Sequence, residues 1–170
     1  FENNYAFAMK RARAQELRVV TIADLARAAQ QLTLGADLEF QSRPEWASVR
    51  DAYGLRFAAV KSYNPTFMYR ALDDAQADVI TAFSSDGRIL SQNLVTLDDP
   101  KNAFPHYDAM ILIAPKRAGD ERLRAALQPL VGAIDLARMR RANLDVDRDA
   151  NKLTPLQAAE RLGKEAGVLK

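Results

Sequence analysis

Residues 78–90 read DVITAFSSDGRIL, and this stretch carries the alternation that decides the fold. Its first part, residues 78–83, is rich in β-branched and aromatic side chains, which is typical of a strand. Residues 84–86 are two serines and an aspartate, types that cap helix N-termini, and an apolar helical segment begins just after them. A strand is therefore followed at once by the start of a helix.

The same alternation extends outward in both directions along the chain. Further strands are expected at Tyr5–Met9, Leu32–Gly35, Leu55–Val60, Leu94–Leu97 and Asp108–Ala114, the last being the most strand-like run. Between them, helices are expected to begin at Thr21, Pro44 and Asn64-Pro65, where a capping side chain or a proline starts each pattern. Alternating strands and helices favour an α/β fold with a mostly parallel, doubly wound sheet.

The pattern changes after Pro115, because only helical periodicity is found from Gly119 onward. The last helix is expected to begin at the capping box Thr154-Pro155-Leu156-Gln157, which has proline at its first helical position. Apolar positions of the two helices before it are Leu123, Leu127, Leu130, Ile134, Leu136 and Met139. The sequence thus predicts an α/β unit over residues 1–114 and a helical tail over residues 115–170.

Composition excludes several classes of protein. The chain has 170 residues, 48% hydrophobic and 27% charged, so it is large and apolar enough for one sizeable core. Its net charge is only +2 with both signs interspersed, which does not indicate nucleic-acid binding. There is no cysteine and only one histidine, so neither a disulfide nor a multi-histidine metal site is expected. No apolar run is long enough to span a membrane.

The sequence gives little support for an enzymatic function. Ser84, Ser85, His106 and Asp108 supply the residue types of a hydrolase triad, but neither serine lies in a G-x-S-x-G motif. The glycines are scattered singly, so no phosphate-binding loop is expected. We therefore predict that the chain is not an enzyme and binds neither a cofactor nor a metal.

Four side chains stand where an open α/β sheet would bind a ligand, outside the carboxyl ends of its strands or on its outermost strands. They are Tyr5, Arg43, Phe83 and Tyr107. Each also has an ordinary interpretation: the three aromatics as core or half-buried strand residues, and Arg43 as a surface residue at a helix start. Periodicity alone does not decide between these alternatives.

A family resemblance favours the binding interpretation. It is carried by Phe1–Ala8 (FENNYAFA), Leu38–Pro44 (LEFQSRP), Met68–Leu72 (MYRAL), Asp78–Ile89, Leu94–Asp99 (LVTLDD), Phe104–Ala109 (FPHYDA) and tail residues 138–147. In this order and spacing, the segments resemble the substrate-binding proteins of osmoprotectant ABC transporters, the glycine betaine, choline and carnitine binders. The resemblance extends over essentially the whole chain.

The resemblance implies a periplasmic binding protein fold of type II, in which two α/β lobes enclose the ligand. Residues 1–114 would be the second lobe, and the tail would pack on the first lobe, most of which is expected to precede Phe1. The implied partners are a small quaternary ammonium solute and an ABC permease. The implied location is the periplasmic or extracytoplasmic face of the membrane, as a soluble, lipid-anchored or permease-fused protein.

The resemblance also assigns roles to the four candidates. Tyr5 and Tyr107 match cage tyrosines of the family, Arg43 matches its carboxylate-binding arginine, and Phe83 stands where a cage aromatic, often tyrosine, is usual. Aromatic faces suit a methylated ammonium, which has no N–H to donate. Guanidinium suits a carboxylate through two parallel hydrogen bonds. Asp86 is interpreted as a helix cap or loop brace.

Two other classes of function stay open on the sequence. The first is the effector-binding domain of a transcriptional regulator, which shares the two-lobed design. The second is a structural fragment that binds nothing when isolated. Because the tail helices would leave apolar positions uncovered, self-association of the isolated chain is also expected.

Overall fold

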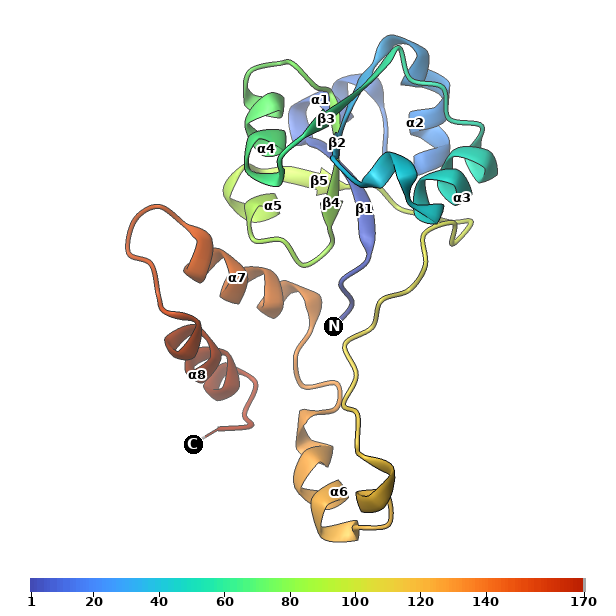
Figure 1. Ribbon diagram of the computed structural model, residues 1–170. Coiled ribbons are helices and arrows are strands. Elements are labelled where there is room, and N and C mark those ends of the chain that lie inside the picture. Colours follow the sequence, from blue (N-terminus) through green and yellow to red (C-terminus); the bar gives the residue numbers. More distant parts are fainter. Residues whose placement is uncertain (170) are drawn as a thin grey trace.

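Five strands form a single mixed sheet in the computed structural model, which describes residues 1–169 (Figure 1). The order is β3-β2-β4-β1-β5. Strand β2 is parallel to β3 and β4, whereas β1 is antiparallel to both of its neighbours, β4 and β5. The bounds are β1 Tyr5–Lys10, β2 Thr33–Asp37, β3 Ala59–Tyr63, β4 Val79–Phe83 and β5 Leu94–Thr96.

The expectation of a mostly parallel sheet is therefore wrong in part. Helical crossovers make consecutive strands parallel, and this holds for β2, β3 and β4. Strand β1 instead enters between β4 and β5, neither of which is joined to it by a crossover, and it runs the opposite way.

Helices cover both faces of the sheet. They are α1 Arg11–Leu17, α2 Ile22–Ala28, α3 Pro44–Tyr53, α4 Pro65–Asp73 and α5 Arg88–Ser91, followed in the tail by α6 Glu121–Leu127, α7 Leu136–Asp147 and α8 Pro155–Glu165. Short 3₁₀ turns occur at η1 Ala29–Gln31, η2 Phe40–Ser42, η3 Pro115–Arg117 and η4 Gln128–Leu130.

Alternation along β1 divides the core into two layers, because successive side chains of a strand point to opposite faces. Phe7 and Met9 pack with residues of α2 and α3 on one face. Ala8 packs with residues of α4 and α5 on the other. Two predicted helix starts are confirmed here: Thr21 forms a capping box with Asp24, and Asn64 caps α4.

Strand β3 lies later in the chain than expected. The apolar run 55–60 was the predicted strand, but pairing occupies Ala59–Tyr63. Leu55 is buried at 3% exposure without being in a strand, directly after Gly54 ends α3 in the left-handed conformation. Leu55 thus packs into the core where the chain leaves α3, and it takes no part in a β ladder.

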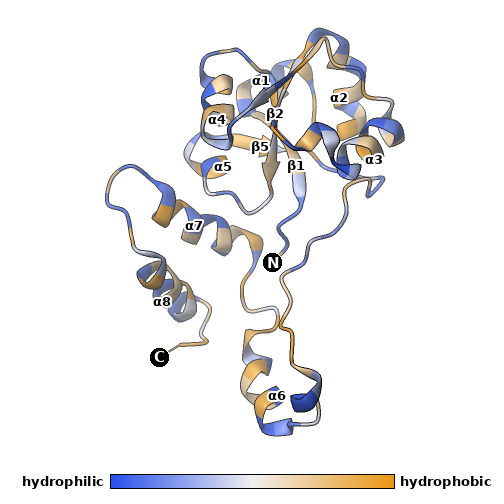
Figure 2. Ribbon diagram, in the orientation of Figure 1, coloured by the Kyte–Doolittle hydropathy of each residue, from blue (hydrophilic) through white to orange (hydrophobic). Residues whose placement is uncertain are grey.

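Residues 108–114, predicted as a strand, pair with no strand of the described residues beyond a single bridge between Glu2 and Asp108. Met110 is 72% exposed and Leu112 is 84% exposed. This segment has β propensity but, within residues 1–169, no neighbouring strand to pair with along its length. It runs away from the sheet as an extended chain toward α6 (Figure 1). Figure 2 shows apolar positions along this connection as well as along the strands of the sheet.

The tail is helical, as predicted, and its last helix ends at Glu165; residue 170 lies outside the described residues. Thr154 and Gln157 form the expected capping box at α8. Helix α7 packs against both α8 and α5. Ile134, expected in the helix with Met139, precedes the start of α7.

Candidate functional site

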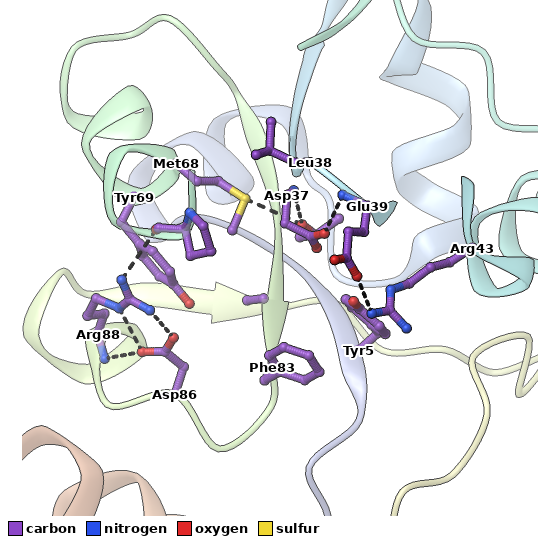
Figure 3. A pocket seen from close by; sticks show the side chains of 13 residues that line it. Tyr5, Asp37, Leu38, Glu39, Arg43, Met68, Tyr69, Phe83, Asp86 and Arg88 are labelled. Atoms are coloured by element: carbon purple, nitrogen blue, oxygen red, sulfur yellow. Dashed lines mark hydrogen bonds and ion pairs between the residues drawn. The ribbon is translucent and has the colours of Figure 1, made fainter. Parts of the chain in front are cut away.

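A cleft of about 320 Å³ opens at the end of the sheet where β2 and β4 finish. The loop after β2, the start of α4 and the loop after β4 form its walls, and β1 contributes from its N-terminal end. Its lining residues are Tyr5, Asp37, Leu38, Glu39, Arg43, Pro65, Met68, Tyr69, Thr81, Ala82, Phe83, Asp86 and Arg88 (Figure 3). This is the end of an open α/β sheet at which ligands usually bind.

Two aromatic rings form the cleft floor beside each other. Tyr5 and Phe83 are direct cross-strand partners of β1 and β4, and their ring centroids lie 4.6 Å apart. Phe83 keeps 43% of its surface exposed, whereas Tyr5 is 6% exposed. Behind Tyr5, the ring of Phe40 packs at 5.2 Å and fixes the tyrosine in place. Burial, followed by the charge of Asp37, raises the pKa of Tyr5, so its hydroxyl stays protonated.

Arg43 lies between η2 and α3, and its side chain lines the same cleft. Its Nη2 atom donates to Oε2 of Glu39 at 2.6 Å. Both side chains are accessible, with 42% and 73% exposed respectively, so the guanidinium has donors free to meet a ligand. Glu39 accepts from one N–H donor of the guanidinium, and the remaining donors are the ones open to a ligand.

Tyr107 stands outside the set of lining residues. Its hydroxyl donates to Oε1 of Glu45 at 2.5 Å, and its backbone N–H donates to Oδ1 of Asn4 at 2.5 Å. Glu45 is 5% exposed in the first turn of α3, and its Oε2 atom is buried with no hydrogen-bond partner. The hydrogen bond from Tyr107 holds the pKa of Glu45 below its ordinary value.

The structure thus brings three of the four candidates together in the cleft and places the fourth on a neighbouring carboxylate. Tyr107 is close enough to Arg43 for that charge to act on its hydroxyl. Glu45 was missed by sequence reasoning; it lies two positions after Arg43, but nothing local in the sequence connects it to Tyr107.

The wall opposite Arg43 is built by Tyr69, Asp86 and Arg88. Arg88 pairs with Asp86 through two parallel bonds, Nε to Oδ1 at 3.0 Å and Nη2 to Oδ2 at 2.7 Å. Its guanidinium carbon lies 3.9 Å from the ring centroid of Tyr69. The Oδ1 atom of Asp86 also accepts from the Arg88 backbone N–H, which confirms the bracing role expected for this aspartate. Tyr69 and Arg88 were not singled out from the sequence.

The residues of a hydrolase triad are not assembled. Ser84 Oγ donates to the Glu2 carbonyl, and Ser85 Oγ donates to Asn3 Oδ1. Within residues 1–169, no hydrogen bond joins His106 to either serine. The same residues contain no cluster of acidic and histidine side chains arranged to hold a metal ion. Nor do they include a helix long and apolar enough to cross a membrane.

Comparison with known families decides what kind of domain carries this cleft. Residues 1–164 match the model of the OpuAC family, the substrate-binding domain of ABC-type glycine betaine transport systems. The chain belongs to this family. Membership makes it a binding domain rather than an enzyme.

Known relatives of this OpuAC-family chain agree with that assignment. A crystal structure of a glycine betaine/carnitine/choline ABC transporter is 28% identical, with a TM-score of 0.88 over 100% of this chain and 62% of that one. The carnitine transport binding protein OpuCC of Listeria monocytogenes (serotype 1/2a, strain 10403S) is 29% identical over 86% of this chain and 49% of its own length.

A further relative combines a binding protein with a permease. The ergothioneine transport permease/ergothioneine binding protein EgtU of Helicobacter pylori (strain G27) is 27% identical over 96% of this chain and 30% of its own length. The chain therefore spans half or less of the length of these two curated relatives.

Proposed function

We propose that this chain supplies one wall of a two-lobed site that binds a quaternary ammonium solute for an ABC importer. The observation that carries the proposal is the cleft in which Tyr5, Phe83 and Arg43 meet, at the ligand-binding end of an OpuAC-family sheet. The solutes in view are glycine betaine, carnitine and choline.

The chemistry of the cleft fits such a solute at both ends. A trimethylammonium group carries a delocalised charge and no N–H, so it is best matched by aromatic faces. Phe83 offers an accessible ring, and Tyr5 stands beside it. Arg43 offers the planar donor pair that a betaine carboxylate accepts. Asp37 adds a carboxylate to the cleft lining, whereas Glu39 and Asp86 are paired there with Arg43 and Arg88.

In this proposal residues 1–114 act as the second lobe, and residues 115–170 as a tail that contacts the first lobe. The relatives extend well beyond the matched region, which leaves room for that lobe. Tyr107, held by Glu45 beside Arg43, would join the aromatic cage when the first lobe closes on this one. The complete protein would act at the extracytoplasmic face of the membrane with its permease. Family membership favours this role over that of a regulator's effector domain.

Calorimetric titration of the complete binding protein tests the proposal. We expect glycine betaine, carnitine or choline to bind with a dissociation constant in the micromolar range, about −8 kcal/mol. Glycine, which keeps the carboxylate but lacks the three methyl groups, is the matched control and should bind far more weakly. Equal affinity for glycine and glycine betaine, or no binding by any of the three solutes, would contradict the proposed function.

A further inference from the structure

Helix α7 of the tail is fastened to the loop that follows β4. Arg140 Nε donates to the Ser84 carbonyl at 2.5 Å, and Asn143 Nδ2 donates to the Ser85 carbonyl at 2.9 Å. Residues three apart share one face of a helix, so a single face of α7 satisfies two consecutive carbonyls. Figure 1 shows α7 running beneath α5 and the loop that precedes it.

A glycine allows this loop and helix to approach each other closely. A Cβ atom added to Gly87 would lie 2.3 Å from the backbone N and 2.5 Å from the Cα of Leu144. Both are main-chain atoms of α7, which no side-chain rotation can move. The loop and the helix are therefore in backbone contact at a position that only glycine fits.

The opposite side of the loop is held by the segment leading into β1. Ser84 N donates to the Asn4 carbonyl at 2.8 Å, and Asn4 N donates back to Ser84 Oγ at 3.0 Å. The loop thus lies between that segment and α7. Two cleft residues depend on its position: Phe83 directly precedes it, and Asp86 lies within it.

The charge of Arg140 marks this contact as more than incidental packing. Burial lowers the pKa of its guanidinium from the ordinary value. Within residues 1–169 it forms no ion pair with a carboxylate, and its hydrogen bond goes to the loop carbonyl. The charge of Glu2 opposes this effect of burial on the pKa, but the hydrogen bond that the guanidinium donates goes to the neutral carbonyl of Ser84, which ties this residue to the loop.

We propose that Arg140 and Asn143 are positioning residues of the solute site, which hold the Ser84–Gly87 loop so that Phe83 and Asp86 keep their places on the cleft wall. The tail then supports the binding wall of this lobe in addition to contacting the first lobe. This inference rests on the proposed function, because its main readout is solute affinity.

The test compares three variants of the complete binding protein by calorimetry with glycine betaine, carnitine and choline. Asn143→Asp is nearly isosteric but replaces the amide donor with an acceptor, and Arg140→Ala removes the other donor. Arg141→Ala is the matched control, since Arg141 is an exposed neighbour on α7 without a contact to the loop. We expect about tenfold weaker binding in the first two variants and a change within about twofold in the control.

Two further readouts separate positioning from general destabilisation. Amide hydrogen exchange at Asp86, whose N–H donates to the Phe83 carbonyl at 3.0 Å, should accelerate in Asn143→Asp while exchange in β2 stays unchanged. Arg140→Lys keeps a cationic donor and should recover most of the affinity lost in Arg140→Ala.

The outcomes are distinguishable. If the wild-type protein binds a solute and Asn143→Asp binds it equally well, the positioning role is refuted and the proposed function stands. If both loop variants and Arg141→Ala lose affinity to the same extent, the effect is not specific to the loop and the inference is overturned. If the wild-type protein binds none of the three solutes, the proposed function fails and this inference fails with it.

Discussion

At the scale of single residues, the cleft gains its character from the unequal exposure of two neighbouring rings. Tyr5 is enclosed by Phe40 and Phe104, whereas Phe83 presents an accessible face. Tyr5 is held in place and turns only a small part of its surface to the cleft, whereas Phe83 is open to it. Since phenylalanine has no hydroxyl, Phe83 contributes its face alone, and polar recognition falls to Arg43 and the carboxylates around it.

The ion pair between Glu39 and Arg43 yields a prediction about solute choice. A solute carboxylate must compete with Glu39 for the guanidinium, and Glu39→Gln removes that competitor. Because an exposed pair is held weakly, we expect affinity for glycine betaine to rise only about two- to fivefold, measured by calorimetry. Choline has no carboxylate and should gain nothing.

Asp51→Asn is the control for this change, since Asp51 forms an equally exposed pair with Arg50 outside the cleft. A gain for choline as large as that for glycine betaine would contradict a carboxylate-binding role of Arg43.

At this scale the sequence predicted best what acts locally, as Asp86 does by bracing Arg88 two residues away. The resemblance brought Tyr5, Arg43 and Phe83 to notice, and they line one cleft; their contact with a solute is a proposal. The partner of Tyr107 could not be read in the same way, because Glu45 is far away in sequence. Only the folded chain brings that buried carboxylate to the tyrosine hydroxyl.

At the scale of elements, local signals again predicted more than long-range ones. The capping boxes at Thr21 and Thr154 bridge residues three apart and are present as expected. Residues 108–114 have strand propensity, but a strand needs a partner, and in the described residues none pairs along this segment. The docking of α7 on the loop after β4 is a contact between distant segments and left no sequence signal.

The contact between α7 and the loop after β4 predicts that adding one methyl group at Gly87 lowers the stability of the protein. Gly87→Ala should push α7 away from the loop, because the added Cβ would overlap the Leu144 backbone. We expect a loss of about 1–3 kcal/mol in the free energy of unfolding, measured by urea titration. Gly119→Ala is the control, since nothing lies within 4 Å of its added Cβ. Equal stability of the two variants would show that α7 is not held against the loop.

At the scale of the whole molecule, the α/β unit has its own two-layered core, while the segment around Met110 and Leu112 and the helix α6 extend away from it. A first lobe that covers these apolar residues is consistent with the greater length of the relatives. Self-association of the isolated chain through the same surface stays a prediction. The change of periodicity after Pro115 predicted a helical tail, and α6, α7 and α8 follow it in the described residues.

The central claim is that the rings of Tyr5 and Phe83 contact the methylated cation. The most direct measurement is the nuclear Overhauser effect between N-methyl protons of bound glycine betaine and assigned ring protons in the complete binding protein. We expect cross-peaks from the N-methyl protons to Phe83 and Tyr5, with the Phe83 peaks absent in Phe83→Leu. Tight binding of glycine betaine without an N-methyl contact to either ring would contradict it.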